Sequence, residues 1–306
     1  MGFGRYIIKS LLASIPVLIG ATFIVFALIY VTGDPVSVIL GEFATPELVE
    51  KLRQDLGLDK PLIVQYFIWL SRVIRGDFGV SYMSRLPVTL VVLERIPTTL
   101  MLTGTAFLIS LGLGISSGVL AALRHGSRVD TIISSVIIFF FSVPYFWFAT
   151  VLLWIFTVQI RLYSTIGDLF QRLWLPSIAL GVPTAAAYAK LTRSNVIDTL
   201  YQDYVRTAKS KGLRERIIII RHVLKNALLP IVALAVLRIP WLFGGAVVTE
   251  SVFGWPGLGS LLITAIYRRD FPIVQAITFI IVVMITVSDI LGDLLMALID
   301  PRVRMG

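Results

Sequence analysis

The sequence predicts an all-α integral membrane protein with six transmembrane helices. Of its 306 residues, 57% are hydrophobic and only 15% are charged, whereas soluble domains carry about 25% charged residues. Several stretches also reach the roughly 20 apolar residues that a helix needs to cross a bilayer. The low charge and the recurring apolar stretches together predict a chain that is folded within lipid.

The six expected spans are the stretches with little or no charge. They run over residues 11–31, 96–123, 131–160, 173–189, 226–249 and 271–288. The fifth span contains Arg238, and the sixth continues through Asp289 and Asp293 to Ile299. Because the count is even, we expect both termini on the same side of the membrane.

The distribution of lysine and arginine indicates that this side is the cytoplasm. Fifteen lie in short segments on the side of the N-terminus, nine of them between Lys190 and Lys225, against four in the opposite short loops. Basic residues in short loops are enriched on the cytoplasmic side. We therefore attribute the net charge of +9 to membrane topology and expect no nucleic-acid partner.

We expect the first span to be a retained helix rather than a cleaved signal peptide. Its uncharged stretch of 21 residues is longer than the apolar core of a signal peptide, which has about 7–15. In the external segment that follows, Thr45, Pro46 and Glu47 predict the start of a short helix that ends at Gly57. The amphipathic stretch Leu62–Ile74 is too short to span and is expected to lie along the outer membrane interface.

The chain lacks the residues that metal, redox or nucleotide chemistry requires. It has no cysteine and two histidines, so a zinc or haem site is not expected. No glycine cluster precedes a Walker lysine, which excludes a P-loop. The glycine-rich segment 254–259 is interpreted as a tight turn at the outer mouth of a pathway, and Gly114 with Gly118 forms a GxxxG pattern typical of helix packing. We expect no enzyme activity and no cofactor in this chain.

Ionisable residues within the predicted spans are candidate pathway residues. Arg238 and Asp289 both lie roughly 15–17 Å from the cytoplasmic ends of their helices, at 1.5 Å per residue. Equal depth makes them a candidate ion pair, and a contact with the transported solute is the alternative. Together with Asp293 they mark the candidate translocation pathway, and Pro240 is expected to kink the fifth span beside Arg238.

The largest predicted cytoplasmic loop has a helical run that ends near Lys211, a break at Gly212 and a second run that leads into the fifth span. We expect this arrangement to expose Val205, Ala208 and Leu213 beside basic residues. From composition, two interpretations stay open. The loop is either a docking element for a partner or a basic segment attracted to lipid headgroups.

A resemblance to a known family decides between them. The stretches DYVRTAKSKGL (203–213) and RHVLKNALLP (221–230) resemble the cytoplasmic signature of ABC importer permeases of the dipeptide and oligopeptide branch. Ala208, Gly212 and Leu224 keep the general signature. The resemblance includes LRQDLGLDKPLIVQY from Leu52, GDFGVSY from Gly76, RIPTTL from Arg95, GGAVVTESVFGWPGLG from Gly244, RDFPIVQ from Arg269 and DPRVR from Asp300.

The resemblance implies a type I ABC importer permease fold, similar to MetI, with a cytoplasmic coupling helix. It implies a bacterial or archaeal inner-membrane heterodimer with a second, paralogous permease. The other expected partners are membrane lipid, two ATP-binding subunits that hold ATP and Mg²⁺, and an extracytoplasmic binding protein. The residues implied to couple to the ATPase are Arg206, Thr207, Ala208, Gly212, Leu213 and His222. Those implied to face the binding protein are Glu250, Phe253, Pro256, Gly257 and Gly259.

The predicted organisation has three parts. Residues 1–95 hold the first span and the external segment, residues 96–300 hold the permease core with the coupling loop at 190–226, and residues 301–306 form a cytoplasmic tail. The resemblance favours peptides as substrate, with nickel, glutathione, opine or oligosaccharide as alternatives. An ion-coupled secondary transporter and a membrane-embedded enzyme are the alternatives from other classes. The family usually has Gln and Asn where this chain has Arg238 and Asp289, so both members of the candidate ion pair differ from the family together, which favours the ion-pair hypothesis.

Overall fold

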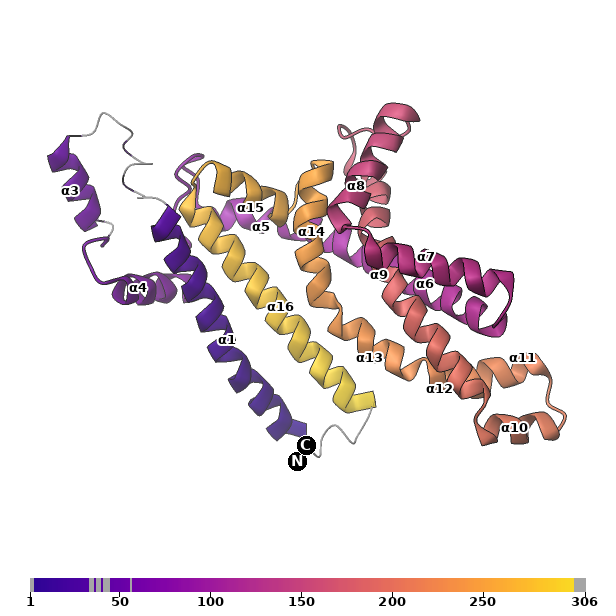
Figure 1. The fold of residues 1–306 in the computed structure, drawn as a ribbon. Coiled ribbons are helices and arrows are strands. Elements are labelled where there is room, and N and C mark those ends of the chain that lie inside the picture. Colours follow the sequence, from indigo (N-terminus) through magenta and orange to yellow (C-terminus); the bar gives the residue numbers. More distant parts are fainter. Residues whose placement is uncertain (1–2, 33–35, 37–39, 41–44, 56, 300–306) are drawn as a thin grey trace. The chain divides into compact units, whose positions relative to one another are not determined.

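The computed structural model describes residues 3–32, 36, 40, 45–55 and 57–299, and every regular element among them is a helix (Figure 1). The helices are α1 (Phe3–Thr32), α3 (Pro46–Asp55), α4 (Leu62–Ile74), α5 (Val88–Leu93), α6 (Ile96–Leu123), α7 (Arg128–Ser142), α8 (Tyr145–Trp154), η1 (Ile155–Gln159), α9 (Leu169–Leu200), α10 (Asp203–Ser210), α11 (Glu215–Ile217), η2 (Ile218–Leu224), α12 (Lys225–Ala227), α13 (Leu229–Leu237), α14 (Ile239–Phe253), α15 (Leu258–Tyr267) and α16 (Phe271–Ile299). The segments η1 and η2 are π-helical. The all-α prediction is confirmed.

Each of the six predicted apolar stretches lies in helical structure. The continuous helical stretches 88–123 and 271–292 are long and apolar enough to cross a membrane, and three bent pairs of helices raise the number to five if each pair makes one crossing. The part of α1 with described side chains, Leu12–Ala27, is apolar but shorter than a full span. The two external helices predicted from sequence are also present as α3 and α4, and Gly57 follows α3 in the left-handed region.

The third predicted span is not one straight helix. Helices α7 and α8 meet at an angle of 105°, and Val143 between them is extended, with φ of −84° and ψ of 129°. The cause is Pro144, which has no amide hydrogen to donate and forces the residue before it out of the helical region. The absence of charge predicted the apolar stretch correctly but carried no information about its direction.

The fifth predicted span is also broken, at two places. Helix α13 begins after Leu228 and ends at Arg238, where α14 begins. A proline follows each break by two residues, Pro230 after Leu228 and Pro240 after Arg238, so each falls in the first turn of the new helix, where a missing amide hydrogen costs least. The kink predicted at Pro240 is confirmed.

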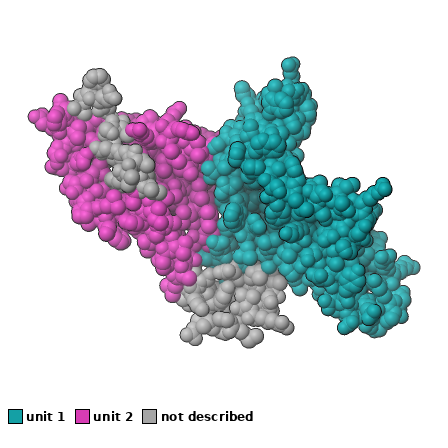
Figure 2. Space-filling model, in the orientation of Figure 1, with its two compact units in different colours: residues 1–7, 100–255, 288–306 teal, residues 8–99, 256–287 magenta. Residues whose placement is uncertain are grey.

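The described chain forms two compact units, coloured separately in Figure 2. Unit 1 holds residues 1–7, 100–255 and 288–306, and unit 2 holds residues 8–99 and 256–287. Helices α6 and α16 each contribute to both units. The predicted boundary after residue 95 lies close to Leu100, where unit 1 resumes.

In unit 1, helices α6 and α9 pack in close contact through glycine. A Cβ atom on Gly114 would lie 2.8 Å from the carbonyl oxygen of Ala185, and one on Gly118 would lie 2.6 Å from that of Ala189. These distances are well below an ordinary van der Waals contact, so only glycine lets the two backbones approach this far. The interpretation of the GxxxG pattern as helix packing is confirmed.

In unit 2, two of the motifs that carry the family resemblance meet at Asp270. This carboxylate is 2% exposed. It accepts hydrogen bonds from the Ser81 hydroxyl at 2.5 Å and from the backbone amides of Tyr82 at 3.1 Å and Met83 at 3.4 Å. Burial, and then the Asp270 carboxylate, raise the pKa of Tyr82 to about 12. The GDFGVSY turn is therefore fixed to the start of α16 by a buried acid that donors surround.

Candidate functional site

Helix α10, in the predicted coupling loop, is seated on the helices of unit 1 by its apolar side. Val205 is fully buried and Ala208 is 5% exposed. Both belong to one hydrophobic cluster that draws on five helical segments, α6, α9, α10, η2 and α12. Its buried members are Ala122, Val196, Val205, Ala208, Ile218, Val223 and Ala227. The prediction that Val205 and Ala208 are exposed is wrong, because a short amphipathic helix gains stability only by packing its apolar side against a core.

The exposed side of α10 and its flanking residues carries aromatic and basic groups. Tyr201 is 80% exposed, Tyr204 is 42% exposed and Leu213 is 40% exposed. The polar residues exposed along the same segment are Gln202, Asp203, Arg206, Thr207, Lys209, Ser210, Lys211 and Arg214. Exposed aromatic and arginine side chains are the types enriched at protein interfaces. The residues available to a partner are therefore Arg206, Thr207 and Leu213 with Tyr201 and Tyr204, while Ala208 anchors the helix from below.

Gly212 ends this helix in a conformation that favours glycine. Its φ is +72°, in the left-handed region that costs an L-amino acid roughly 1–2 kcal/mol. Its backbone amide donates to the carbonyl of Lys209 at 3.0 Å, and no atom lies within 4 Å of the place a Cβ would occupy. The predicted break at Gly212 is confirmed as a left-handed turn that directs the chain from α10 into α11.

The return from Gly212 is tied back to α10 by Asn226. Its side-chain amide donates to the hydroxyl of Tyr204 and to the backbone carbonyl of His222, both at 3.0 Å. His222 lies in the π-helical segment η2 and is partly buried. Its position places it in the support of α10 rather than on the exposed side. π-Helical turns distort the regular hydrogen-bond ladder and are frequent at functional sites.

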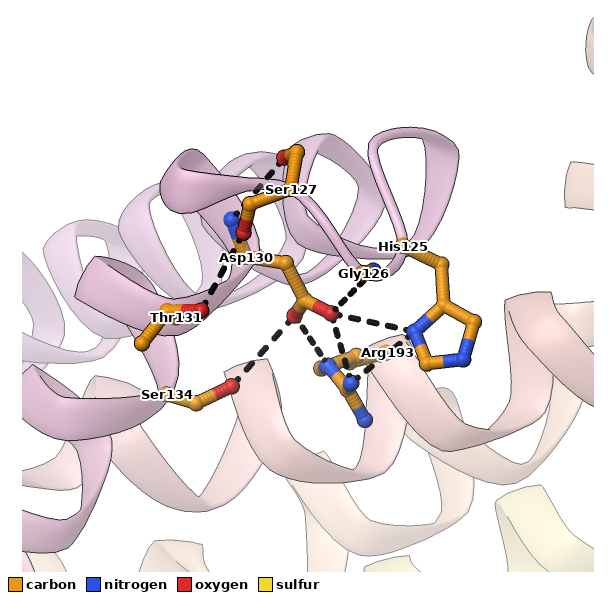
Figure 3. Close-up of polar contacts among 7 residues, drawn as sticks. All are labelled: His125, Gly126, Ser127, Asp130, Thr131, Ser134 and Arg193. Atoms are coloured by element: carbon orange, nitrogen blue, oxygen red, sulfur yellow. Dashed lines mark hydrogen bonds and ion pairs between the residues drawn. The ribbon is translucent and has the colours of Figure 1, made fainter.

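Three charged or ionisable side chains form a network between the turn after α6, the first turn of α7 and helix α9. We call His125, Asp130 and Arg193 the clamp (Figure 3). Arg193 of α9 donates from Nε to Asp130 Oδ1 at 2.6 Å and from Nη2 to Oδ2 at 2.8 Å. His125 Nδ1 lies 3.0 Å from the same Oδ2. The arrangement is a bidentate arginine–carboxylate pair, the geometry with the strongest directional preference among ion pairs.

Local structure prepares Asp130 for this role. Ser127 caps the first turn of α7, with its hydroxyl accepting from the amide of Asp130 at 3.4 Å. The amide of Gly126, at φ of +77°, donates to Asp130 Oδ2 at 3.0 Å. Asp130 is 4% exposed. The Arg193 hydrogen bonds hold the pKa of Asp130 well below its usual range despite burial, and the same contacts raise the pKa of Arg193.

Of the predicted pathway residues, Arg238 makes a contact with an aromatic ring. The guanidinium carbon of Arg238 lies 5.9 Å from the centre of the Trp241 ring, a cation–π contact. Asp289 is exposed, and the side chain of Asp293 lies outside the described residues. A role of these three residues in a pathway stays a prediction.

The residues predicted to face a binding protein mostly build a turn rather than cover its surface. Glu250 and Phe253 are fully buried. Gly257 and Gly259 are buried and Pro256 is partly exposed. Gly254 ends α14 in the left-handed region, and its carbonyl accepts from Arg172 Nη2 at 2.9 Å. Their predicted direct contact with a partner is therefore not supported for the buried members, because their own chain covers them.

The sequence did not point to the clamp, to Tyr204 of α10 or to Tyr201 just before it. Arg193 counted there only as a basic residue that sets topology, and Asp130 counted only as the charge that ends a span. A local signal was present at Ser127, since serine three residues before an acid is typical of a helix start. No group of three or more His, Asp or Glu side chains among the described residues is placed to hold a metal ion.

Comparison with known proteins places this geometry in a transporter family. The profile of the "Binding-protein-dependent transport system inner membrane component" family matches residues 114–305, and that of the corresponding N-terminal region matches residues 3–103. The chain is 36% identical over 302 residues to the glutathione transport system permease protein GsiC of Escherichia coli K12, covering 98% of this chain and 99% of the relative. The GsiC protein of Shigella dysenteriae matches equally well.

Two solved structures share the fold. The MetNI methionine ABC transporter in inward-facing conformations has a chain that superposes with a TM-score of 0.58 at 17% identity, over 69% of this chain and 96% of that one. An amino acid ABC transporter crystallised with histidines gives a TM-score of 0.52 at 19% identity, over 68% and 94%. At this identity the likeness concerns the fold, and it confirms the predicted MetI-like permease architecture.

Proposed function

Because the chain belongs to the inner membrane components of binding-protein-dependent transport systems, we propose that it forms the path for a small peptide or related solute in an ATP-driven importer. The chain itself is a multi-pass membrane permease subunit of the ABC importer class. Energy for transport would come from ATP and Mg²⁺ bound by two separate ATP-binding subunits.

The observation that carries the proposal is the seating of α10. Its apolar side is fixed to α6 and α9 through Val205 and Ala208, while Tyr201, Tyr204 and Arg206 face outward. An element fixed on one side and exposed on the other can transmit movement from a partner to the helices beneath it. We propose that this exposed side lies in the cytoplasm and occupies a groove of an ATPase subunit.

In the proposed mechanism, closure of the two ATPase subunits displaces α10 and shifts the permeases from inward-facing to outward-facing states. A second, paralogous permease would complete the path, and an extracytoplasmic binding protein would deliver the solute. Lipid would surround the remaining apolar helix faces. This arrangement assigns binding, closure and passage to different chains.

For the substrate, we propose the peptide class. The GsiC relatives are named for glutathione, which is itself a small peptide. The proposal therefore covers dipeptides, oligopeptides and glutathione, with nickel, opines and oligosaccharides as the competing solutes of the same machinery. An ion-coupled secondary transporter is the competing mechanism.

The test is to purify the chain with the partners encoded beside it and reconstitute the complex in liposomes. We expect the ATPase subunits to co-purify and labelled di- and tripeptides to accumulate only with ATP present. Uptake that survives an inactivated ATPase but stops when ion gradients are dissipated would contradict the ATP-driven mechanism. Uptake of nickel or sugar instead of peptides would contradict only the substrate class.

A further inference from the structure

We infer that the clamp positions the coupling element by making α6, α9 and α10 move as one body, so that the Asp130–Arg193 pair is needed to convert ATP hydrolysis into transport. This inference rests on the proposed function and adds a positioning role for residues outside the coupling signature. Neither Asp130 nor Arg193 touches the expected ATPase surface or the solute. They act through the helices that they join.

The first step of the argument is the place of the clamp. Arg193 precedes Val196 by three residues on α9, and His125 follows Ala122 by three residues at the end of α6. Ala122 and Val196 are members of the cluster that holds α10. Three residues of helix correspond to about 4.5 Å along the axis. The clamp therefore fastens the turn after α6 and the first turn of α7 to α9, about one helical turn from the residues of α6 and α9 that meet α10.

The second step is that α6 and α9 are also fastened farther along their length. The backbones approach closely at Gly114 and Gly118, where only glycine fits. The clamp extends this contact past the last residue of α6 to the turn that begins α7. Beside it, the ends of α6 and α9 next to α10 meet through apolar contacts, which include those of Ala122 and Val196.

The third step is that the segment that follows α10 contains several points where it can bend. It passes through Gly212, the π-helical segment η2 and the breaks at Leu228 and Arg238. A force applied to α10 thus meets an irregular segment on its C-terminal side and the closely packed helix α9 on its N-terminal side. Sharp bends in helices concentrate where the regular ladder is interrupted. In this inference, the clamp determines whether α9 and α6 move with α10 or separate from it.

The fourth step is the cost of removing one partner. Asp130 is 4% exposed, and its carboxylate accepts hydrogen bonds from two nitrogens, Nε and Nη2, of the Arg193 guanidinium. Removing Arg193 leaves the buried Asp130 carboxylate without its arginine partner, whereas removing Asp130 leaves an arginine side chain that is 28% exposed. A substitution at one member should therefore disturb the end of α9 directly, and loss of both members should do no more harm than loss of one.

The experiment compares Asp130→Asn, Arg193→Gln and the double variant with the wild-type complex in liposomes. ATP hydrolysis and solute uptake are measured in the same sample. We expect each single variant to assemble and to hydrolyse ATP. The number of ATP molecules consumed per solute transported should rise about tenfold or more above the wild-type value, because one charge of the pair loses its partner. The double variant should be no worse than the worse single one. An unchanged ratio in the single variants would overturn the inference.

Matched controls come from the same segments. Asp198 on α9 and Arg128 at the start of α7 are exposed, and Asp198→Asn with Arg128→Gln removes the same two charge types without touching the clamp. These controls should keep the wild-type ratio. If they raise it as much as the clamp variants do, net charge and not the clamp sets coupling, and the inference fails.

A second measurement separates fastening from charge. The chain has no cysteine, so Asp130→Cys with Arg193→Cys introduces the only thiols in this subunit. A short bifunctional thiol reagent is used, because a direct disulfide needs Cα atoms within about 7 Å, closer than an arginine side chain normally allows. Cross-linking should lower the ATP consumed per solute towards the wild-type value. A cross-linked complex that stays uncoupled would overturn the inference.

If Asp130→Asn fails to assemble, Arg193→Lys carries the test. Lysine keeps the charge but cannot make the bidentate contact, so we expect assembly with an intermediate ratio. A wild-type ratio in Arg193→Lys would show that the geometry of the pair is not needed. Absence of ATP-driven uptake in the wild-type complex would instead contradict the proposed function, which keeps the two failures distinct.

Discussion

Substitution of Gly212 is the most direct perturbation of the coupling loop. Its φ of +72° costs an alanine roughly 1–2 kcal/mol, and open space around its missing Cβ means that no steric cost is added. A cost of this size reduces the population of the native turn about 5- to 30-fold. Asparagine tolerates the left-handed region and should cost less.

Proline should be the most damaging residue at this position. Its ring fixes φ near −65°, so the native turn is inaccessible, and the amide that donates to Lys209 at 3.0 Å is lost. Helix α10 keeps its own anchors, Val205 and Ala208, so the spans should still insert. The expected order of coupling is glycine, asparagine, alanine and then proline.

The assay is ATP hydrolysis and solute uptake by the reconstituted complex, with membrane insertion checked separately. Gly57→Ala is the matched control, because Gly57 has φ of +70° and open space around its missing Cβ but lies in unit 2. This variant should keep the wild-type ratio of ATP consumed to solute moved. Normal transport by Gly212→Pro, or equal damage from asparagine and alanine, would refute the reasoning.

Three further predictions concern packing, pH and the pathway. Gly118→Ala should destabilise the purified complex by about 1–3 kcal/mol through overpacking, whereas Gly112→Ala on the same helix meets no atom within 4 Å; equal thermal midpoints would contradict this. The depressed pKa of Asp130 means that its stabilisation is present above the unfolded value near 4 and is lost as pH falls below it. The thermal midpoints of wild type and Asp130→Asn should therefore differ by a constant amount from pH 8 to 5 and converge below pH 4; convergence already at pH 6 would be the contrary result. For Arg238→Gln, Asp289→Asn and the double variant, the ion-pair hypothesis predicts that the double variant transports better than its worse single parent; a double variant no better than that parent would contradict the hypothesis.

Some local features followed from the sequence because their causes are local. The helix over 62–74 depends on its own amphipathic pattern, and the left-handed turn at Gly212 depends on the residue that tolerates it. The close packing at Gly114 and Gly118 also follows from residue size alone. Such features require no knowledge of what lies across the space.

Other features could not be predicted from the sequence, because they depend on which segments of the chain meet. Val205 and Ala208 looked exposed beside their basic neighbours, yet they are buried because Ala122 and Val196, from distant parts of the chain, lie against them. The contact between Arg238 and Trp241 was not predicted either, because depth along a helix does not fix the direction of a side chain. Arg238 turns to Trp241, its neighbour on the next turn.

The sequence by itself determined that this protein crosses a membrane, that it is helical and that its basic loop carries a break at Gly212, since hydropathy, charge and glycine content act within a few residues. Only the tertiary structure decided that Pro144 turns the third apolar stretch by 105° and that Asp130 and Arg193, 63 positions apart, form a partly buried pair. The physical reason is the separation along the chain over which each effect acts. An ion pair or a shared core is a property of two surfaces in contact, and the sequence lists the groups on each surface without stating which surfaces meet.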